Sequence, residues 1–150
     1  MSNNYLYLLL ALAAGAMMPT QAATNNKMAV FLNDSPILAA FISFFVGTVA
    51  LFIYAIASGA SLGDLTLAKN ATPIAWIGGL LGAFFVTATV TLVPRLGVAM
   101  TFSLIIAGQM IVTLVIDHFG LLGVPTKEIS LARIGGILLI TAGVVLIRKF

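Results

Sequence analysis

The sequence predicts an all-α integral membrane protein with five transmembrane helices. Hydrophobic residues make up 61% of the 150 positions and charged residues only 7%, against about 25% charged residues in soluble domains. Eleven charges are too few to cover a soluble fold of this size, and they leave long gaps. A membrane-spanning helix needs about 20 apolar residues. The charge-free stretches that satisfy this are residues 1–26, 35–63, 70–94 and 96–116.

The first helix is expected over residues 5–28, with Pro19 inside it. Residues 5–18, followed by the small residues after Pro19, resemble a signal peptide with its cleavage site. A signal peptide carries Lys or Arg before its apolar stretch, however, and residues 1–4 contain neither. We therefore expect this segment to be retained as a transmembrane helix.

Two Ser/Thr–Pro pairs mark the beginnings of the next helices. Ser35 followed by Pro36 combines a capping residue with proline at the first helical position, and predicts a helix over residues 36–57. Thr72 and Pro73 repeat the pattern and predict a helix over residues 73–93. Trp76, near the start of that helix, is typical of the aromatic belt at a membrane interface.

The last two helices are expected over residues 97–116 and 130–147, after a tight break at residues 94–97. The fifth is the shortest, because its uncharged part, residues 134–147, extends only about 21 Å at 1.5 Å per residue. Arg133 and Arg148 must extend toward the two interfaces for this helix to cross.

Several classes of function are excluded by composition. The chain has no cysteine and one histidine, His118, so we expect no disulfide, metal site or cofactor. The basic residues are scattered rather than clustered, which argues against nucleic acid as a partner. No set of acid, base and nucleophile falls inside the predicted helices, so an enzyme is not expected.

The basic residues are almost evenly divided between the two sides of the membrane. With five crossings, Lys69, Lys127 and Arg133 lie on one side. The other side holds Lys27, Arg95, Arg148 and Lys149. Cytoplasmic loops normally carry an excess of Lys and Arg, so this balance favours insertion in both orientations. Two opposed copies would form a ten-helix antiparallel dimer with the inverted symmetry of many transporters. The alternative is that the weak bias suffices to fix one orientation.

A series of short motifs, in order along nearly the whole chain, resembles the YdcZ-type family of small five-helix membrane proteins, in the drug/metabolite transporter superfamily. The motifs are AG at 14–15, PTQ at 19–21 with Asn25, SFFVGT at 43–48, WIGGLLGAF at 76–84, PRLG at 94–97, GQ at 108–109, DHFG at 117–120 and RIG at 133–135.

The resemblance implies a multi-pass protein of the bacterial inner membrane that transports a small molecule. Members of this family look like antiparallel homodimers, pairs of related opposite-facing chains, or fused ten-helix chains. This chain has half the length of the fused form, and its basic residues are balanced between the two sides of the membrane. Both features suit the homodimer. The expected partners are therefore the lipid bilayer, a second copy or a related chain, and a small-molecule substrate.

Polar residues inside the first predicted helix are candidates for substrate binding. Gln21 and Asn25 lie four residues apart and share a face. Pro19, just before them, lacks a backbone N–H and frees the carbonyl of Gly15. Polar side chains at this depth usually face the bundle interior or a cavity. The alternative is that they hydrogen-bond neighbouring helices and only stabilise packing.

Other candidates lie on the third and fourth helices. Gln109 can donate and accept hydrogen bonds near mid-membrane, and Thr87 and Thr91 share one face. Each has a structural alternative, since threonine often bonds its own helix backbone and glutamine can bond a neighbouring helix. Pro19, inside the first helix, and Arg95 and Asp117, at helix ends, are candidates for gating or for anchoring at the interface.

The absence of acidic residues inside the predicted helices narrows the class of solute that we expect as substrate. Asp34, Asp64, Asp117 and Glu128 all fall at helix ends or in loops, whereas proton relays usually use buried carboxylates or histidine. The small multidrug exporters of the same superfamily rely on a buried glutamate in their first helix, where this chain offers Gln21. We therefore expect alternating-access transport of a polar neutral, zwitterionic or anionic solute. The alternative function is a non-transporting scaffold or subunit of a membrane complex.

Overall fold

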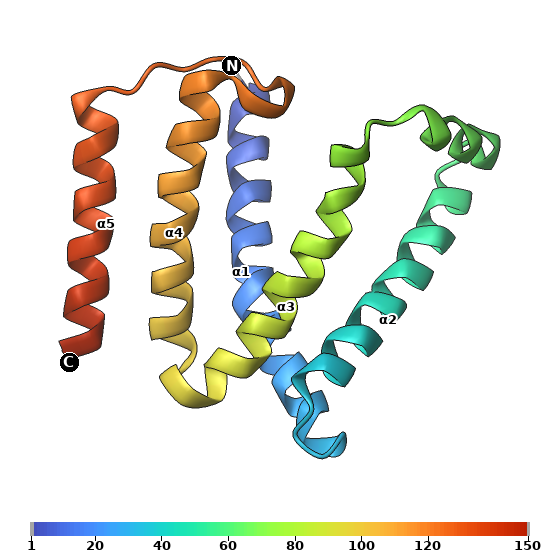
Figure 1. Ribbon diagram of the computed structural model, residues 1–150, viewed down its shortest axis with the longest axis horizontal. Helices are drawn as coiled ribbons and strands as arrows, with labels where there is room; N and C mark the ends of the chain where they lie inside the picture. The colour runs from blue at the N-terminus through green and yellow to red at the C-terminus, as the bar shows by residue number, and fades with distance from the viewer. Residues whose placement is uncertain (1, 150) are drawn as a thin grey trace. The chain divides into compact units, whose positions relative to one another are not determined.

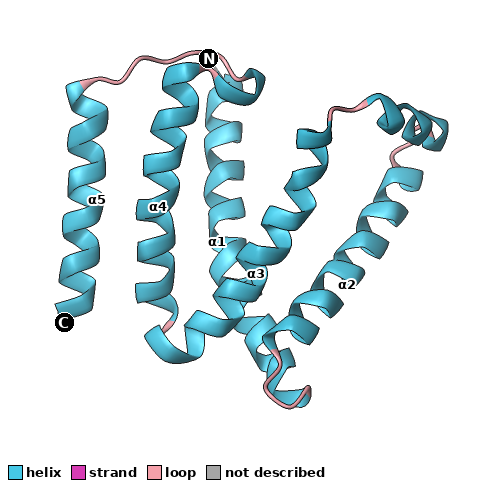
Figure 2. Cartoon of the chain, in the orientation of Figure 1, coloured by secondary structure: helices cyan, strands magenta, loops and turns pink. Residues whose placement is uncertain are grey.

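The computed structural model describes residues 2–149, with side chains from residue 5 onward, and this part of the chain is helix and loop (Figures 1 and 2). Five α-helices are long and apolar enough to cross a membrane, as the sequence predicts. They are α1 (Ser2–Phe31), α2 (Pro36–Ala57), α3 (Ile77–Leu96), α4 (Val98–Phe119) and α5 (Leu131–Lys149). Three short 3₁₀-helices lie in the connections. Between α2 and α3 are η1 (Leu62–Asn70) and η2 (Pro73–Trp76), and between α4 and α5 is η3 (Leu121–Gly123).

The chain divides into two compact units, Met1–Arg95 and Leu96–Phe150. In the first unit, α1 lies against α2, and α3 joins them through a core of small side chains. Alanines let α1 and α2 approach closely. The core consists of Ala29, Ala39, Ala40, Val86 and Val90, with Leu32 and Phe85 packed against it.

A second contact between α2 and α3 depends on a glycine. A Cβ atom added to Gly82 would lie 3.2 Å from the ring of Phe44, closer than ordinary van der Waals contact. The missing side chain of Gly82 therefore makes room for Phe44. A Cβ at Gly78 or Gly79 would meet nothing within 4 Å.

The first part of α1 has no face covered by α2 or α3. The six consecutive side chains from Tyr5 to Leu10 are each 64–69% exposed. Successive residues in a helix point about 100° apart, so six of them cover every direction around the axis. Neither α2 nor α3 therefore covers this segment on any side.

In the second unit, α4 and α5 lie side by side, joined by the segment from Gly120 to Ser130 (Figure 1). Gly120 ends α4 in the left-handed conformation, with φ at 59°, which glycine adopts without strain. The connection then returns to α4, where the Lys127 N–H donates to the Asp117 carbonyl at 2.8 Å.

The helix bounds follow the sequence signals where a cap or a turn residue is decisive. The segment α2 spans Pro36–Ala57, as the Ser35–Pro36 pair predicts, and Leu38 N–H donates to Ser35 Oγ at 3.4 Å. The segment α1 continues to Phe31, three residues beyond the predicted end at Met28. Its end is set by the turn that follows, where Asn33 adopts a left-handed conformation.

The ends of α3 and α4 differ from the prediction. The segment α3 begins at Ile77 because residues 73–76 form η2, and it continues past Pro94 to Leu96. Proline removes one intrahelical hydrogen bond, a small loss in the final turn of a helix. The break occurs at Gly97, whose φ is 77°. The segment α4 extends to Phe119, because the residue that ends it is Gly120 and not Asp117.

The segment between the second and third predicted helices, residues 58–72, contains the 3₁₀-helix η1. Its residues Leu62, Leu65 and Ala68 are three apart, and side chains at that spacing lie on one face of a 3₁₀-helix. The Thr66 hydroxyl donates to the Gly63 carbonyl at 2.8 Å within it.

Candidate functional site

A polar groove runs between α1 and α2, and we call it the α1–α2 groove. It consists of two hollows, of about 370 and 200 Å³, that share Gln21 and Ser43. One face of α1 supplies most of the polar groups, because residues three and four apart align along a helix. The lining residues are Met17, Met18, Thr20, Gln21, Thr24, Asn25, Ser43, Phe44, Gly47, Thr48 and Leu51.

The polar groups of the groove differ in whether they are already bonded. The hydroxyls of Thr20 and Thr24 donate to carbonyls of their own helix, each at 2.9 Å. Asn25 is only 7% exposed, yet its buried Nδ2 has no hydrogen-bond partner within the described residues. A buried amide without a partner is unfavourable by about 1–3 kcal/mol, so this amide is a candidate to bind something outside this chain.

The groove lies at the depth of the membrane interior. The charge-free helix α2 serves as a ruler, since Pro36–Ala57 extends about 33 Å at 1.5 Å per residue, close to the bilayer core. Gly47 lies next to the midpoint of α2, and Ser43 lies about 5 Å from it. Gln21 lines the same hollow as Gly47, which places its amide near the middle of the membrane.

The two predicted threonines of α3 lie together, apart from Gln21 and Asn25. Thr87 and Thr91 line a shallow hollow of about 270 Å³ on α3, with mostly apolar neighbours. The Thr91 hydroxyl donates to the Thr87 carbonyl at 2.8 Å, which is the structural alternative that the sequence left open. This hollow offers few polar contacts to a solute.

The remaining predicted residue for binding, Gln109, belongs to α4 in the second unit. Its side chain is exposed, and its carbonyl accepts a hydrogen bond from the Thr113 hydroxyl at 2.7 Å. Pro19 lies inside α1, which remains one helix through it. Pro19 has no N–H to donate to the carbonyl of Gly15, one helical turn earlier. Because Thr20 and Gln21 follow Pro19 directly and line the groove, this carbonyl lies about one turn from the groove.

Besides Pro19, two residues were predicted for gating or anchoring, and these two have different partners. The Arg95 guanidinium donates through Nη1 to the Thr91 carbonyl at 3.1 Å. The Asp117 carboxylate accepts from Arg133 Nη2 at 2.5 Å, and Arg133 also donates to the Lys127 carbonyl at 3.2 Å. The ion pair of Asp117 therefore fastens the end of α4 to the start of α5.

Some polar residues near these sites were not singled out from the sequence. Ser43 lines the same hollow as Asn25 because the α1–α2 turn brings the two helices together, a tertiary arrangement that no local motif encodes. Asn26 and Asp34 line a second hollow together with Arg95. A usable signal for Asp34 was its place in a short turn before a capped helix, where asparagine and aspartate tolerate left-handed backbone.

Comparison with known proteins decides the family. The family model described as "Putative inner membrane exporter, YdcZ" matches residues 6–146, almost the whole chain. The chain belongs to the YdcZ family. This confirms the resemblance carried by the sequence motifs, and with the five apolar helices it identifies a multi-pass inner membrane protein.

A curated relative supports the same family. The Inner membrane protein YdcZ of Escherichia coli (strain K12) is 36% identical over 73 residues. This match covers 49% of the chain and 49% of that protein, so the alignment spans about half the length of each. No solved structure matches the chain.

Proposed function

We propose that this YdcZ-family chain moves a small polar solute across the inner membrane by alternating access, as an antiparallel pair of identical chains. The α1–α2 groove of each copy would line the path. The observation that carries the proposal is Asn25, which lines a hollow between α1 and α2 and whose buried Nδ2 has no hydrogen-bond partner within the described residues.

The exposed polar groups of the groove favour a second copy of the chain as the surface that covers them. In hydrocarbon, polar groups must be satisfied by protein or by enclosed water, and Gln21 is exposed beside Ser43 in the single chain. A second copy in the opposite orientation would cover both grooves at once, because a two-fold interface uses the same surface on each partner. The even division of basic residues permits that orientation.

The chemistry of the groove favours an uncharged or zwitterionic polar solute, or an anion, over a proton-coupled cation. Amides and hydroxyls both donate and accept hydrogen bonds, and Gln21, Asn25 and Ser43 supply these groups. The lining residues include no Asp or Glu. A carboxylate that exchanges protons for a cation is therefore not among the groups around this groove.

The test is uptake by liposomes that contain the purified full-length protein. A panel of radiolabelled amino acids, polyols and organic anions would be screened for exchange against the same unlabelled solute. Gln21→Leu and Asn25→Leu should abolish exchange while leaving the elution volume of the assembly unchanged. Asn70→Leu, in the exposed η1 connection, is the matched control and should retain exchange.

Two outcomes would count against the proposal. If the protein exchanges no solute in the panel, transport through this groove is not its activity. If Gln21→Leu and Asn25→Leu disperse the assembly instead of leaving it intact, the polar groups act as contacts between helices. The second result would favour the alternative function, a non-transporting scaffold.

A further inference from the structure

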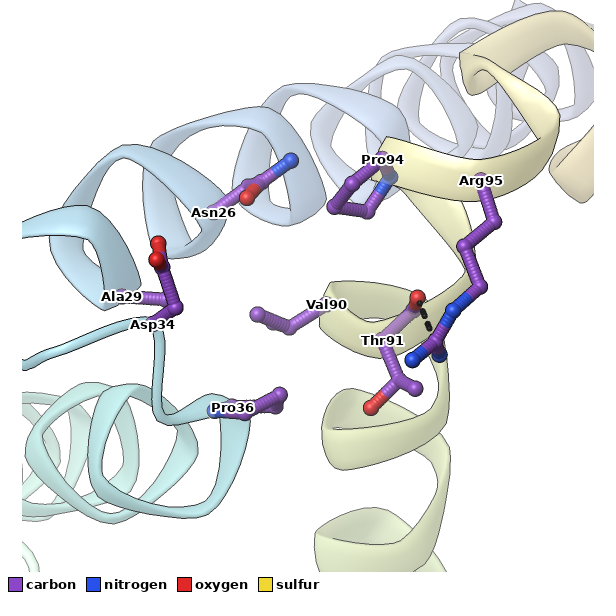
Figure 3. Close-up of a pocket in the computed structure, with 8 residues that line it drawn as sticks. All are labelled: Asn26, Ala29, Asp34, Pro36, Val90, Thr91, Pro94 and Arg95. Atoms are coloured by element: carbon purple, nitrogen blue, oxygen red, sulfur yellow. Dashed lines mark hydrogen bonds between the residues drawn. The ribbon is translucent and has the colours of Figure 1, made fainter.

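A second hollow of the first unit lies at the membrane edge, and we call it the Asp34–Arg95 pocket (Figure 3). It has a volume of about 210 Å³ and lies where the turn between α1 and α2 meets the last turn of α3. Its lining combines four polar and four apolar residues: Asn26, Asp34, Thr91 and Arg95, with Ala29, Pro36, Val90 and Pro94.

The pocket carries one negative and one positive side chain that do not pair with each other. The ion pair of the described residues joins Asp117 to Arg133, in the other unit. The Asp34 carboxylate has neither a hydrogen bond nor an ion pair within the described part of the chain. Arg95 uses Nη1 to bond the Thr91 carbonyl, and a guanidinium has five N–H donors. Both charges therefore retain capacity to bind a ligand.

The backbone fixes the position of Asp34. Asn33 and Asp34 both adopt left-handed conformations, with φ at 54° and 56°, which only asparagine, aspartate and glycine visit routinely. The Ser35 N–H donates to the Leu32 carbonyl at 3.2 Å, and Pro36 begins α2 directly afterwards.

The α3 side of the pocket supplies the opposite charge and an additional acceptor. Arg95 extends back along α3 toward Thr91, opposite Asp34 and Asn26 (Figure 3). Pro94 lacks an N–H, so the carbonyl of Val90, four residues earlier, has no intrahelical donor. Val90 and Pro94 both line the pocket. An ammonium group in the pocket could thus use Asp34, and an anionic group could use Arg95.

We propose that the Asp34–Arg95 pocket binds a small zwitterion, with its ammonium group at Asp34 and its anionic group at Arg95. A ligand with one charge would leave the other pocket charge without a counterion. The volume equals that of about seven water molecules at ~30 Å³ each, which suits a solute of amino-acid size. The same chemistry occurs in a free solute and in a phospholipid headgroup with an ammonium and a phosphate.

Binding at this pocket can be measured without transport, because it shares no lining residue with the α1–α2 groove. Purified full-length protein would be placed in phosphatidylglycerol nanodiscs, whose headgroups carry no ammonium and do not offer the proposed zwitterion, and titrated by calorimetry. The zwitterionic probe is γ-aminobutyrate, and butyrate and butylamine are its singly charged counterparts. We expect γ-aminobutyrate to bind at least tenfold more tightly than either counterpart.

Phosphoethanolamine, the soluble form of a lipid headgroup, distinguishes the two sources of the ligand. Tighter binding of γ-aminobutyrate than of phosphoethanolamine identifies a free solute, and the reverse order identifies a headgroup. Either result supports a zwitterion site. If neither probe binds, or if butyrate binds as tightly as γ-aminobutyrate, the proposal is wrong.

Three variants connect the binding to the pocket. Asp34→Asn keeps a residue suited to the left-handed backbone and removes the negative charge, and Arg95→Gln removes the positive charge. Each should weaken binding of the preferred probe at least tenfold. Lys27→Gln removes a charge from the same side of the membrane without touching the pocket, and should leave binding unchanged. Equal losses in Lys27→Gln and Arg95→Gln would overturn the assignment to this pocket.

Discussion

Asp117, in the last turn of α4, and Arg133, in the first turn of α5, form an ion pair of 2.5 Å between Oδ2 and Nη2. Their side chains are 21% and 32% exposed. The backbone follows the same path, since Lys127 bonds the Asp117 carbonyl and Arg133 bonds the Lys127 carbonyl. The sequence predicted only that Arg133 extends toward the membrane interface. In the structure Arg133 also forms an ion pair with Asp117.

Removing this pair should loosen the second unit. We expect Asp117→Asn to lower the free energy of unfolding in detergent by about 1 kcal/mol, the upper range for partly exposed ion pairs. Arg133→Gln should lower it further, because Arg133 also bonds a backbone carbonyl. The double variant should resemble Arg133→Gln alone, as measured by a double-mutant cycle. Additive losses would show that the two side chains do not interact in the membrane protein.

The contact between Gly82 and Phe44 predicts a position-specific effect of bulk. Gly82→Leu should destabilise the chain by about 1–3 kcal/mol, because the new side chain overlaps the Phe44 ring. Gly78→Leu, four residues earlier on the same helix, is the matched control and should have little effect. Thermal unfolding in detergent measures both, and Phe44→Ala should restore part of the stability of Gly82→Leu. Equal effects at both glycines would contradict this packing.

Asn25 predicts a conflict between stability and function. Its buried Nδ2 has no partner in the described chain, so Asn25→Leu should raise the free energy of unfolding by about 1–2 kcal/mol while transport is lost. Thr89→Val is the control, since the buried Thr89 hydroxyl already donates to the Val86 carbonyl at 2.8 Å. It should give no gain. A loss of stability in Asn25→Leu would show that Asn25 bonds another helix.

Dual orientation can be tested because the chain lacks cysteine. Ser61→Cys, in the exposed segment before η1, should react with a membrane-impermeant maleimide in about half the molecules of intact cells. Leu96→Cys, at the opposite side of the membrane by connectivity, should also react in about half. Full labelling of one variant and none of the other would establish a single orientation and would contradict the antiparallel pair of identical chains.

Much of the fold could be predicted because membrane helices are encoded locally. Composition and charge gaps determine how many helices form, and Ser35 with Pro36 determines where α2 begins. The ends of α1 and α3 were misplaced because the decisive residues follow the helix, at Asn33 and Gly97. A proline in the last turn, such as Pro94, weakens a helix less than it does in the interior.

The candidate sites were only partly predictable, for a related reason. Gln21 and Asn25 share a face of one helix, so their spacing is enough to place them together. Ser43, and the combination of Asn26, Asp34 and Arg95, depend on how three segments of the first unit meet. Sequence spacing within a helix does not specify such contacts, and the charges of Asp34 and Arg95 gave no sign of their common pocket.

The uncovered first part of α1 has a consequence for how copies associate. Lipid tails solvate the side chains from Tyr5 to Leu10 as well as a protein partner does, so their burial contributes little to pairing. Association then depends on how closely the helices of two copies pack and on how many lipids compete for the same surface. The fraction of paired chains should follow the protein-to-lipid ratio, with added lipid separating the copies as dilution in water separates a soluble dimer.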